Sequence, residues 1–420
     1  MATSDIYRAP IGTKDIFGFE ARKWQTLINI FAKQAHLYNY DLAMTPVFEH
    51  IEVFNRVGED TDVVSKEMYD FYDKGDRHIA LRPESTAGIA RVVAQHRPIS
   101  PFKAWYMNQH FRYERPQKGR LREHHQFGIE AIGIDDPMID VEIIAFAHNF
   151  FKSLGVTQYI IGINSMGDSE ARAKHMIALR EYFIKYVDLL GEDFALRVEK
   201  NPLRILDTKD PAWIEIAKNA PQILDFLSEQ SITDFEVIKE SLTNLGIPFE
   251  VIPTLVRGFD YYTNTTFEFI SSSIDAAQAT ICAGGRYNKL VKEMGGEETP
   301  GIGFGLGIER LLMVIEAEKL EIRTRILDVF IVDLINSFES KNYFQNINSD
   351  LRNSGISVDN CFGIKSMKAS MKQADRSGAR FVIICGENEW DKKVITLRNM
   401  SSGEQCEMTT DMIIDYLKKH

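Results

Sequence analysis

The sequence predicts an α+β protein in which an antiparallel sheet is interrupted by a helical segment and followed by a separate α/β unit. Residues 111–130 alternate polar and apolar side chains on both sides of a turn, which is typical of two antiparallel strands. Residues 170–240 are charged and strongly helical, with few glycines. After about residue 325, apolar strands alternate with helical sequence. We therefore expect a core formed by 1–170 and 241–322, a helical insertion at 171–240 and a further unit at 326–420.

Length and composition are those of a folded, soluble protein. The chain has 420 residues, 44% of them hydrophobic, which is enough for two or three domains. It contains no run of 18 apolar residues, and its first residues have neither a hydrophobic stretch nor the composition of a transit peptide. We expect a cytoplasmic protein that does not enter a membrane.

Charge and cysteine usage exclude other classes. A net charge of -11 argues against indiscriminate coating of nucleic acid, so a nucleic-acid partner would have to be met by local basic patches. The cysteines are widely spaced and form no Cys-x-x-Cys pair, which favours buried free thiols and indicates neither a disulfide framework nor a structural metal. They are Cys282, Cys361, Cys385 and Cys406.

The first elements are a long helix and a short strand. Residues 20–38 place Trp24, Leu27 and Phe31 at helical spacing, which predicts an amphipathic helix with one buried stripe. Residues 40–49 contain Pro46, which a central strand tolerates poorly. An edge or interface position is expected there, where a second copy of the chain could dock.

Residues 79–95 read as a strand that ends at Pro83 and a helix that begins near Ser85 or Thr86. Glu84 lies at the junction. It could simply be a favourable charge at the helix N-terminus, with Ser85 or Thr86 as the cap. Alternatively, Glu84 and Thr86 could face a pocket and accept hydrogen bonds from an ammonium group.

The strand pair at 111–130 has two unlike faces, because side chains alternate with a period of two. A solvated outer face is one interpretation of the polar side, and a ligand-binding face around Gly128, which has no side chain, is the other. The polar face comprises Arg112, Glu114, Arg122, His124, Gln126, Gly128 and Glu130. The apolar face, expected in the core, comprises Phe111, Tyr113, Phe127, Ile129 and Ala131.

Strand character returns after residue 250. Arg257 lies in so apolar a segment that it needs an anionic partner, and Tyr261 and Tyr262 open the next strand. Residues 299–316 alternate glycine with apolar residues and run into a helix that carries Arg310. The spacing matches neither a dinucleotide-binding nor a P-loop motif. The glycines could leave a flat surface for a planar ring or could serve tight packing against a helix.

The helix at 365–377 is the second basic patch. A stripe of Met367, Met371 and Ala374 is expected to be buried. The opposite face could bind nucleic-acid phosphates or be a solvated face. It carries Lys365, Lys368, Lys372 and Arg376.

These segments together supply the groups that a phosphorylated or zwitterionic ligand requires. Arginine can hold phosphate or carboxylate oxygens in a bidentate manner, and Glu84 and Glu130 can neutralise cationic groups. No pair of nucleophile and base stands out, so catalysis by positioning and charge stabilisation is favoured. The arginines are Arg112, Arg120, Arg257 and Arg310.

The order of motifs resembles the histidyl-tRNA synthetase family, within the class II aminoacyl-tRNA synthetases, over essentially the whole chain. The motifs are LRPESTA, FRYERPQKGRLREHHQFGIEAIG, LVRGFDYY, GGRY and GIGFGLGIERL. The resemblance implies a catalytic core on an antiparallel sheet, a helical insertion and a C-terminal α/β anticodon-binding domain. It further implies L-histidine, ATP with Mg²⁺ and tRNA(His) as substrates, no permanently bound cofactor or metal, and a homodimer formed through residues 40–49.

The resemblance also implies roles for single residues. Arg257 and Arg112 are expected to be catalytic through the α-phosphate. Histidine binding is assigned to Glu84, Ser85, Thr86, Arg112, Gln126, Glu130, Arg257, Tyr261 and Tyr262. ATP binding is assigned to Arg112, Glu114, Arg120, His124 and Arg310. Contact with tRNA is assigned to Arg115, Gln117 and Lys118 near the acceptor end, and to Lys365, Lys368, Lys372 and Arg376 near the anticodon stem.

Two residues depart from the family pattern, and one other function class competes. Ser85 stands where Gly is common, and His124 stands where a Phe would stack on adenine; an imidazole stacks less extensively. The competing class is a histidine-sensing regulatory relative without catalysis, of the ATP phosphoribosyltransferase regulatory type. Retention of Arg112, Arg257 and Arg310 and of the residues after the core argues against it.

Overall fold

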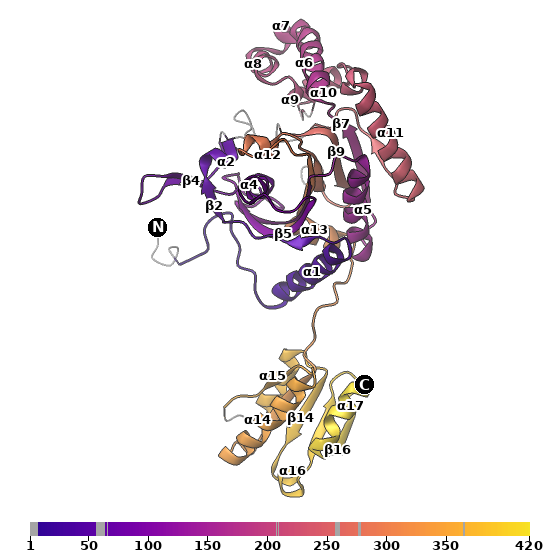
Figure 1. Cartoon of the computed structure of the whole chain (residues 1–420). Helices are drawn as coiled ribbons and strands as arrows, with labels where there is room; N and C mark the ends of the chain where they lie inside the picture. The colour runs from indigo at the N-terminus through magenta and orange to yellow at the C-terminus, as the bar shows by residue number, and fades with distance from the viewer. Residues whose placement is uncertain are drawn as a thin grey trace. The chain divides into compact units, whose positions relative to one another are not determined.

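The computed structural model describes residues 7–55, 64, 66–206, 208, 210–256, 261–275, 279–363 and 366–420. The chain divides into two compact units, residues 1–322 and 323–420, each of which is described by itself (Figure 1). In the described part of the chain, no helix has both the length and the apolar composition needed to cross a bilayer.

The first unit is built on an eight-stranded sheet, which confirms the predicted α+β class. Its inner pairs are antiparallel, while the outermost pairs, β1 with β5 and β7 with β8, are parallel. The strands in spatial order are β1 (Asp41–Leu42), β5 (Phe102–Phe111), β6 (Glu123–Ile132), β11 (Gly301–Gly307), β10 (Thr280–Arg286), β9 (Thr263–Ser271), β7 (Tyr159–Ser165) and β8 (Glu250–Val251).

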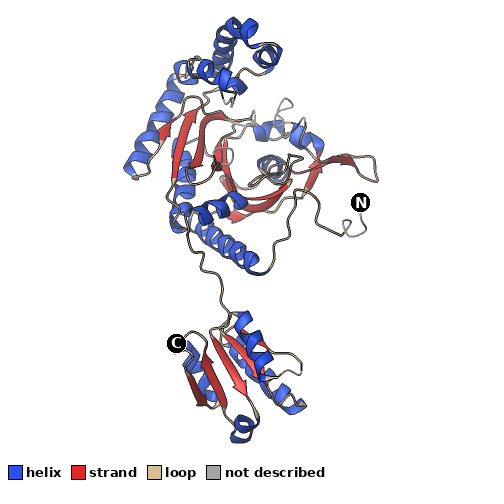
Figure 2. Cartoon of the chain, turned by 180° about the vertical axis from the view of Figure 1, so that it is seen from behind, coloured by secondary structure: helices blue, strands red, loops and turns tan. Residues whose placement is uncertain are grey.

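Helices pack on both faces of this sheet. The predicted N-terminal helix is α1 (Gly18–Leu37), and its stripe of Leu27, Phe31 and Ala35 is fully buried. The same core holds side chains of α5 (Pro137–Ser153), α11 (Glu229–Asn244) and α13 (Ile308–Ala317). The concave face, seen in Figures 1 and 2, holds α4 (Thr86–His96) and α12 (Leu290–Glu293).

A small sheet stands beside α4. It has the order β2 (Phe48–His50), β4 (His78–Leu81) and β3 (Asp70–Tyr72), and α2 (Ile51–Asn55) follows β2. Residues 40–49 thus contribute β1, an edge strand as expected, and the start of β2.

The helical insertion follows β7. It has a hydrophobic cluster of its own, which includes Met166, Phe183 and Phe194. Its elements are α6 (Ser169–Phe183), η2 (Ile184–Tyr186), α7 (Val187–Leu190), α8 (Glu192–Lys200), α9 (Leu203–Leu206), α10 (Pro211–Lys218) and η3 (Ile223–Phe226). The next helix, α11, packs on the main core through Phe235, Ile238 and Leu242.

The second unit is a five-stranded mixed sheet with helices, as predicted for an α/β unit. Strand β12 is parallel to β13 and β14, while β15 and β16 extend the sheet antiparallel. In spatial order the strands are β13 (Val358–Asn360), β12 (Val329–Asp333), β14 (Phe381–Cys385), β15 (Ile395–Asn399) and β16 (Gln405–Met408). The helices are α14 (Phe338–Asn353), α15 (Met367–Ser377), α16 (Glu387–Lys392), η5 (Thr410–Met412) and α17 (Ile413–Lys419).

Several local predictions were wrong. Strand β5 ends at Phe111, so Arg112 and Glu114 lie beyond it rather than on a strand face. Tyr113 is 55% exposed, because it lies beyond the end of β5 and not in the core; its ring packs against the Arg122 guanidinium, 3.9 Å from the ring centroid. Met367 is also exposed, since it is the first residue of α15.

All four cysteines are free. Cys282 and Cys385 are buried as expected, whereas Cys361 and Cys406 are only half-buried.

Candidate active site

A cavity of about 310 Å³ lies on the concave side of the large sheet. Side chains of the β4–α4 junction, of β6 and the turn before it, and of β9, β10 and β11 border it. The lining residues are Glu84, Ser85, Thr86, Tyr106, Arg112, Glu114, Gly119, Arg120, Leu121, His124, Gln126, Tyr261, Tyr262, Glu268, Thr280, Ile281, Cys282, Ala283, Gly305, Gly307, Glu309 and Arg310. Most residues assigned to histidine and ATP therefore meet in one place, although they come from distant segments.

Glu84 both caps helix α4 and borders the cavity. Its carboxylate accepts hydrogen bonds from the backbone N–H groups of Thr86 at 2.5 Å and Ala87 at 2.8 Å. The predicted favourable charge at the helix N-terminus is confirmed, although Glu84 and not Ser85 accepts the capping hydrogen bonds, and Glu84 and Thr86 do border a pocket. Burial raises the pKa of Glu84. A buried carboxylate at this position can accept a further hydrogen bond from a cationic ligand.

Ser85 is the residue before the first turn of α4, yet its hydroxyl does not cap the helix. It lies 2.7 Å from Nε2 of His110 and accepts a hydrogen bond from the Asn108 side chain at 2.8 Å. Since Asn108 and His110 belong to β5, these contacts tie the helix start to the sheet beneath it. Ser85 thus holds Glu84 in place.

Three guanidinium groups border the cavity. Arg112 donates from Nε to the Pro83 carbonyl at 2.9 Å. Arg310 donates to two backbone carbonyls, those of Gly119 at 3.2 Å and Thr280 at 2.7 Å.

Arg120 forms an ion pair with Glu114 at 3.2 Å. Burial lowers the pKa of Arg310, and the positive charge of Arg120 lowers it further. Backbone carbonyls orient Arg112 and Arg310, and the positive charges of Arg120 and Arg112 act on Arg310, so an anion in the cavity would relieve the repulsion among these groups.

His124 presents a neutral ring to the cavity. Burial, followed by the nearby charges of Arg112 and Arg310, holds the pKa of His124 well below its usual range. Its ring lies 5.5 Å from that of His110, at a tilt of 53°. A planar uncharged ring at this place could stack on a purine.

Glu130 is placed differently from the expectation. It is fully buried and does not border the cavity, because hydroxyl groups cover it. Its carboxylate accepts hydrogen bonds from Thr86 at 2.8 Å, Tyr287 at 2.5 Å and Tyr106 at 3.4 Å. Burial raises the pKa of Glu130 to about 8, against the lowering effect of those hydroxyl donors. Thr86 and Tyr106, which do line the cavity, connect Glu130 to it.

The raised pKa makes stability depend on pH. A carboxyl whose pKa is about 8 when folded and 4.5 in the ordinary state stabilises the fold below the lower value. That contribution is lost as the pH rises through about 8. Glu130→Gln removes this titration. We expect the difference in melting temperature, Gln variant minus wild type, to increase as the pH is raised from 5 to about 8. Parallel melting curves across that window would contradict the assignment.

Tyr261 and Tyr262 form one wall of the cavity and belong to the same hydrophobic cluster as α4. Both are 7% exposed, and their rings lie 4.6 Å apart. Burial and the charge of its neighbour Tyr262 raise the pKa of Tyr261 well above its usual value, so the phenol is a neutral donor. Arg257, just before this pair in the sequence, lies outside the described residues.

Glycines make room for these side chains and not for a flat open surface. A Cβ on Gly303 would lie 1.8 Å from Oε2 of Glu130, and one on Gly128 would lie 2.2 Å from the Tyr106 ring. The space above Gly128, expected to admit a ligand, is therefore filled by Tyr106. Gly305 and Gly307 do border the cavity, and Gln126 covers part of Gly305.

The residues assigned to tRNA lie apart from the cavity lining. Arg115, Gln117 and Lys118 are exposed on the turn between β5 and β6, where Gln117 and Arg120 pair through their backbones. In the second unit, Lys368, Lys372 and Arg376 are exposed on α15, and Lys365 lies outside the described residues.

Sequence reasoning missed part of the lining. Glu268 lies on β9 and accepts a hydrogen bond from the Thr280 hydroxyl at 3.0 Å. Glu309 lies 2.8 Å from Nδ1 of His125 and accepts from the His125 backbone. A charged Glu268 within the apolar run TTFEFIS was a usable signal, because strands buried on both faces rarely carry a carboxylate. Nothing in the local sequence singled out Tyr106.

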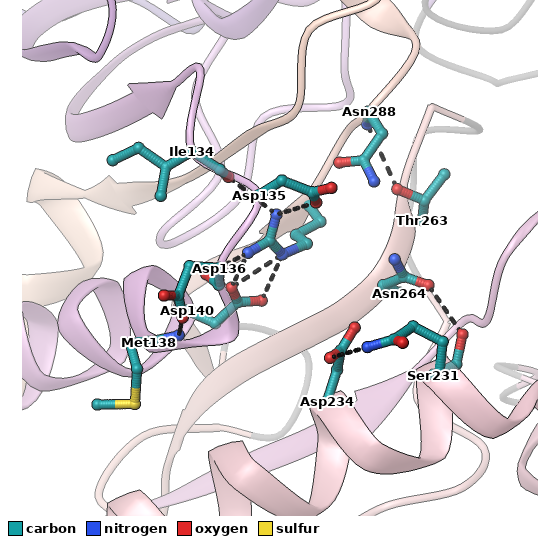
Figure 3. Close-up of polar contacts among 12 residues, drawn as sticks. Ile134, Asp135, Asp136, Met138, Asp140, Ser231, Asp234, Thr263, Asn264 and Asn288 are labelled. Carbon is teal, nitrogen blue, oxygen red and sulfur yellow. Dashed lines mark hydrogen bonds and ion pairs between the residues drawn. The ribbon is translucent and has the colours of Figure 1, made fainter.

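A buried ion pair joins two elements of the core near the site (Figure 3). Arg286, from the GGRY motif, contacts Asp140 at 2.5 Å, and both are almost fully buried. It also donates to the carbonyls of Ile134 and Asp136, and so joins the end of β10 to the start of α5. The next residue is Tyr287, which holds Glu130.

Comparison with known proteins agrees with this geometry. The family model described as "Histidyl-tRNA synthetase" matches residues 12–174 and 203–311, and the model described as "Anticodon binding domain" matches 328–420. A histidine–tRNA ligase of Geobacillus sp. is 45% identical over 420 residues, covering 98% of this chain and 99% of that protein.

Solved structures give the same result. The apo histidyl-tRNA synthetase of S. aureus matches with a TM-score of 0.82 at 37% identity, covering 98% of this chain and 99% of that one. A Bacillus halodurans structure, described as an ATP phosphoribosyltransferase regulatory subunit/histidyl-tRNA synthetase, shares the fold at 22% identity with a TM-score of 0.65, covering 90% of this chain and 98% of that one. On the full-length identity and the two family models together, the chain belongs to the histidyl-tRNA synthetase family.

Proposed function

We propose that the chain is a histidine–tRNA ligase that works in two steps. The carboxylate of L-histidine attacks the α-phosphorus of ATP, which forms histidyl-adenylate and releases pyrophosphate. A terminal ribose hydroxyl of tRNA(His) then attacks the acyl carbon and displaces AMP. Family membership supports the reaction, and the observation that carries it to this cavity is the convergence of guanidinium, carboxylate and phenol groups on one space.

The arginines supply charge stabilisation. Arg112 is proposed to hold the α-phosphate and the histidine carboxylate, and Arg120 and Arg310 the outer phosphates. Fixed cations act on the charge that develops at phosphorus without reorganising during the step. Arg257 is proposed as a second contact to the α-phosphate, on the family motif alone. Glu114 and His124 are proposed to bind the adenine, by hydrogen bonding and stacking respectively.

The other end of the cavity is proposed to bind histidine. Glu84, with Thr86 and Gln126, accepts from the ammonium group, while Tyr261 and Tyr262 meet the imidazole. Glu130 acts on the ring through Thr86 and Tyr106. A side chain without two ring nitrogens would leave these buried polar groups unpaired, which is a strong form of discrimination.

The remaining partners follow from the same assignment. Magnesium is proposed to enter with ATP as part of the substrate, and the Glu268 carboxylate is the kind of oxygen ligand it takes. A homodimer is proposed through residues 40–49 and their surroundings, where Met44 is 85% and Phe48 53% exposed. The cytoplasm is proposed as the compartment.

Histidine-dependent exchange of pyrophosphate into ATP tests the activation step, and charging of tRNA(His) tests the transfer step. Exchange with histidine but not with the other amino acids is the expected result. Binding of histidine without exchange would favour the regulatory class instead. A protein that neither bound histidine nor catalysed the exchange would overturn the proposal.

The row of exposed basic residues on α15, Lys368, Lys372 and Arg376, gives a prediction for tRNA binding. Reversing Lys368 and Lys372 to Glu is expected to weaken tRNA binding about tenfold at low salt, because two phosphate contacts become repulsive. Pyrophosphate exchange should not change. Measuring affinity across a salt series, with Lys392→Glu on α16 as an exposed control in the same unit, distinguishes the row from a solvated face. Equal affinities in all three proteins would leave the row as a solvated face.

A further inference from the structure

The insertion and the tyrosine wall of the cavity meet at one joint. Strands β7 and β9 pair up to Ser165 with Thr265. Beyond that pair, the Met166 N–H donates to the Asn264 carbonyl at 2.6 Å, and the Asn264 N–H donates to the Gly167 carbonyl at 2.9 Å. The chain enters the insertion on one side of this joint. On the other side, it comes directly from Tyr261 and Tyr262.

Side chains of the insertion reinforce the joint. Arg172, in the first turn of α6, donates from Nη1 to the Tyr262 carbonyl at 3.2 Å. Ser231, at the start of α11, donates to the Asn264 side chain at 3.4 Å (Figure 3). The first helix of the insertion, α6, thus holds Tyr262, and the helix that follows the insertion, α11, holds Asn264.

The conformation of the joint leaves little freedom. Asn264 has a φ of 45°, and Gly167 has a φ of 64°. A Cβ on Gly167 would lie 2.7 Å from Ala171, so α6 packs directly on the turn. Packed turns of this kind transmit a displacement of α6 to the strand and do not absorb it.

On the core side the same strand end is held separately. Thr263 accepts a hydrogen bond from the Asn288 N–H at 3.4 Å (Figure 3). Asn288 follows Tyr287, which donates a hydrogen bond to Glu130. Residues 262–264 therefore lie between the insertion and the network beneath the cavity.

We propose that Arg172 and Asn264 are positioning residues that couple the insertion to the amino-acid end of the cavity. The inference rests on the proposed function and deepens it: the position of α6 sets the Tyr261–Tyr262 wall, and hence the affinity for histidine. It makes no use of the ATP end, which is formed by Arg112 and Arg120, between β5 and β6, and by Arg310 on α13.

Arg172→Met in the full-length protein tests the coupling. We expect the KM for histidine in pyrophosphate exchange to rise about tenfold, because a hydrogen bond from a charged donor to the wall is lost. The KM for ATP should change less than about twofold. Lys174→Met is the matched control, since Lys174 lies on the same helix, is exposed and pairs only locally with Glu170.

Two further measurements separate positioning from folding. Arg172→Lys keeps a donor and should recover most of the affinity for histidine. Amide exchange at Met166 and Asn264 should slow on addition of histidine in wild type and in Lys174→Met, but not in Arg172→Met.

An unchanged KM for histidine in Arg172→Met, or equal changes in both KM values, would overturn the coupling. A wild-type protein without histidine-dependent exchange would instead overturn the proposed function.

Discussion

Arg112→Met is expected to lower the rate of histidine-dependent pyrophosphate exchange about 10²- to 10³-fold, the range found when one fixed donor to a developing charge is removed. The side chain borders the cavity between Glu84 and Arg310, and its Nε is fixed by the Pro83 carbonyl. Methionine fills similar volume but cannot donate. Initial rates at saturating histidine and ATP measure the effect.

The melting temperature of the variant shows whether the fold survives this change. Arg77→Met is the matched control: Arg77 pairs with Asp73 on the exposed β3–β4 turn and does not line the cavity. Its exchange rate should equal that of wild type. An Arg112 variant with an ordinary rate, or one that melts at a lower temperature than the control, would remove Arg112 from the chemistry.

Arg286→Met is expected to destabilise the first unit by about 3–5 kcal/mol, the cost of leaving one charge of a buried pair without its partner. Asp140 is fully buried, and the Arg286 guanidinium contacts Asp140 and the carbonyls of Ile134 and Asp136 at the β10–α5 joint. Burial already raises the pKa of Asp140, which Arg286 opposes. Urea unfolding, followed by the fluorescence of Trp24 and Trp105, measures the loss in the free energy of unfolding.

The double variant Arg286→Met with Asp140→Leu separates charge from packing. Since no charge then remains buried, most of the stability should return. If the double variant were as unstable as the single one, the arginine would act through the shape of the joint and its contacts to the carbonyls of Ile134 and Asp136.

Much of the fold could be predicted because the periodicity of the sequence is strong. The helix over α1, the β4–α4 junction and the glycine strand β11 all follow from local pattern. The end of β5 could not be predicted, because polar alternation continues past Phe111 while the backbone turns away. There the Tyr113 N–H donates to the Glu67 carbonyl, a contact between distant residues.

The sequence pointed to most of the residues that line the cavity, but not to how deeply each one is buried. Alternation places Gln126 and Glu130 on one face of β6, yet only the register with β5 brings Tyr106 opposite Gly128. That pairing puts a phenol over the glycine and separates Glu130 from the cavity. The insertion boundary was similarly hidden, since α11 has the composition of the insertion but packs on the main core.

The glycines of β11 have a consequence for redesign. Position 303 cannot gain even one methyl group while a carboxylate occupies the same space from the neighbouring strand. A version of this enzyme selective for another amino acid would therefore have to shorten residue 130 before, or together with, any change on β11. The two positions should be randomised as a pair, because a library that varies position 303 alone, with Glu130 retained, would return mostly side chains that clash.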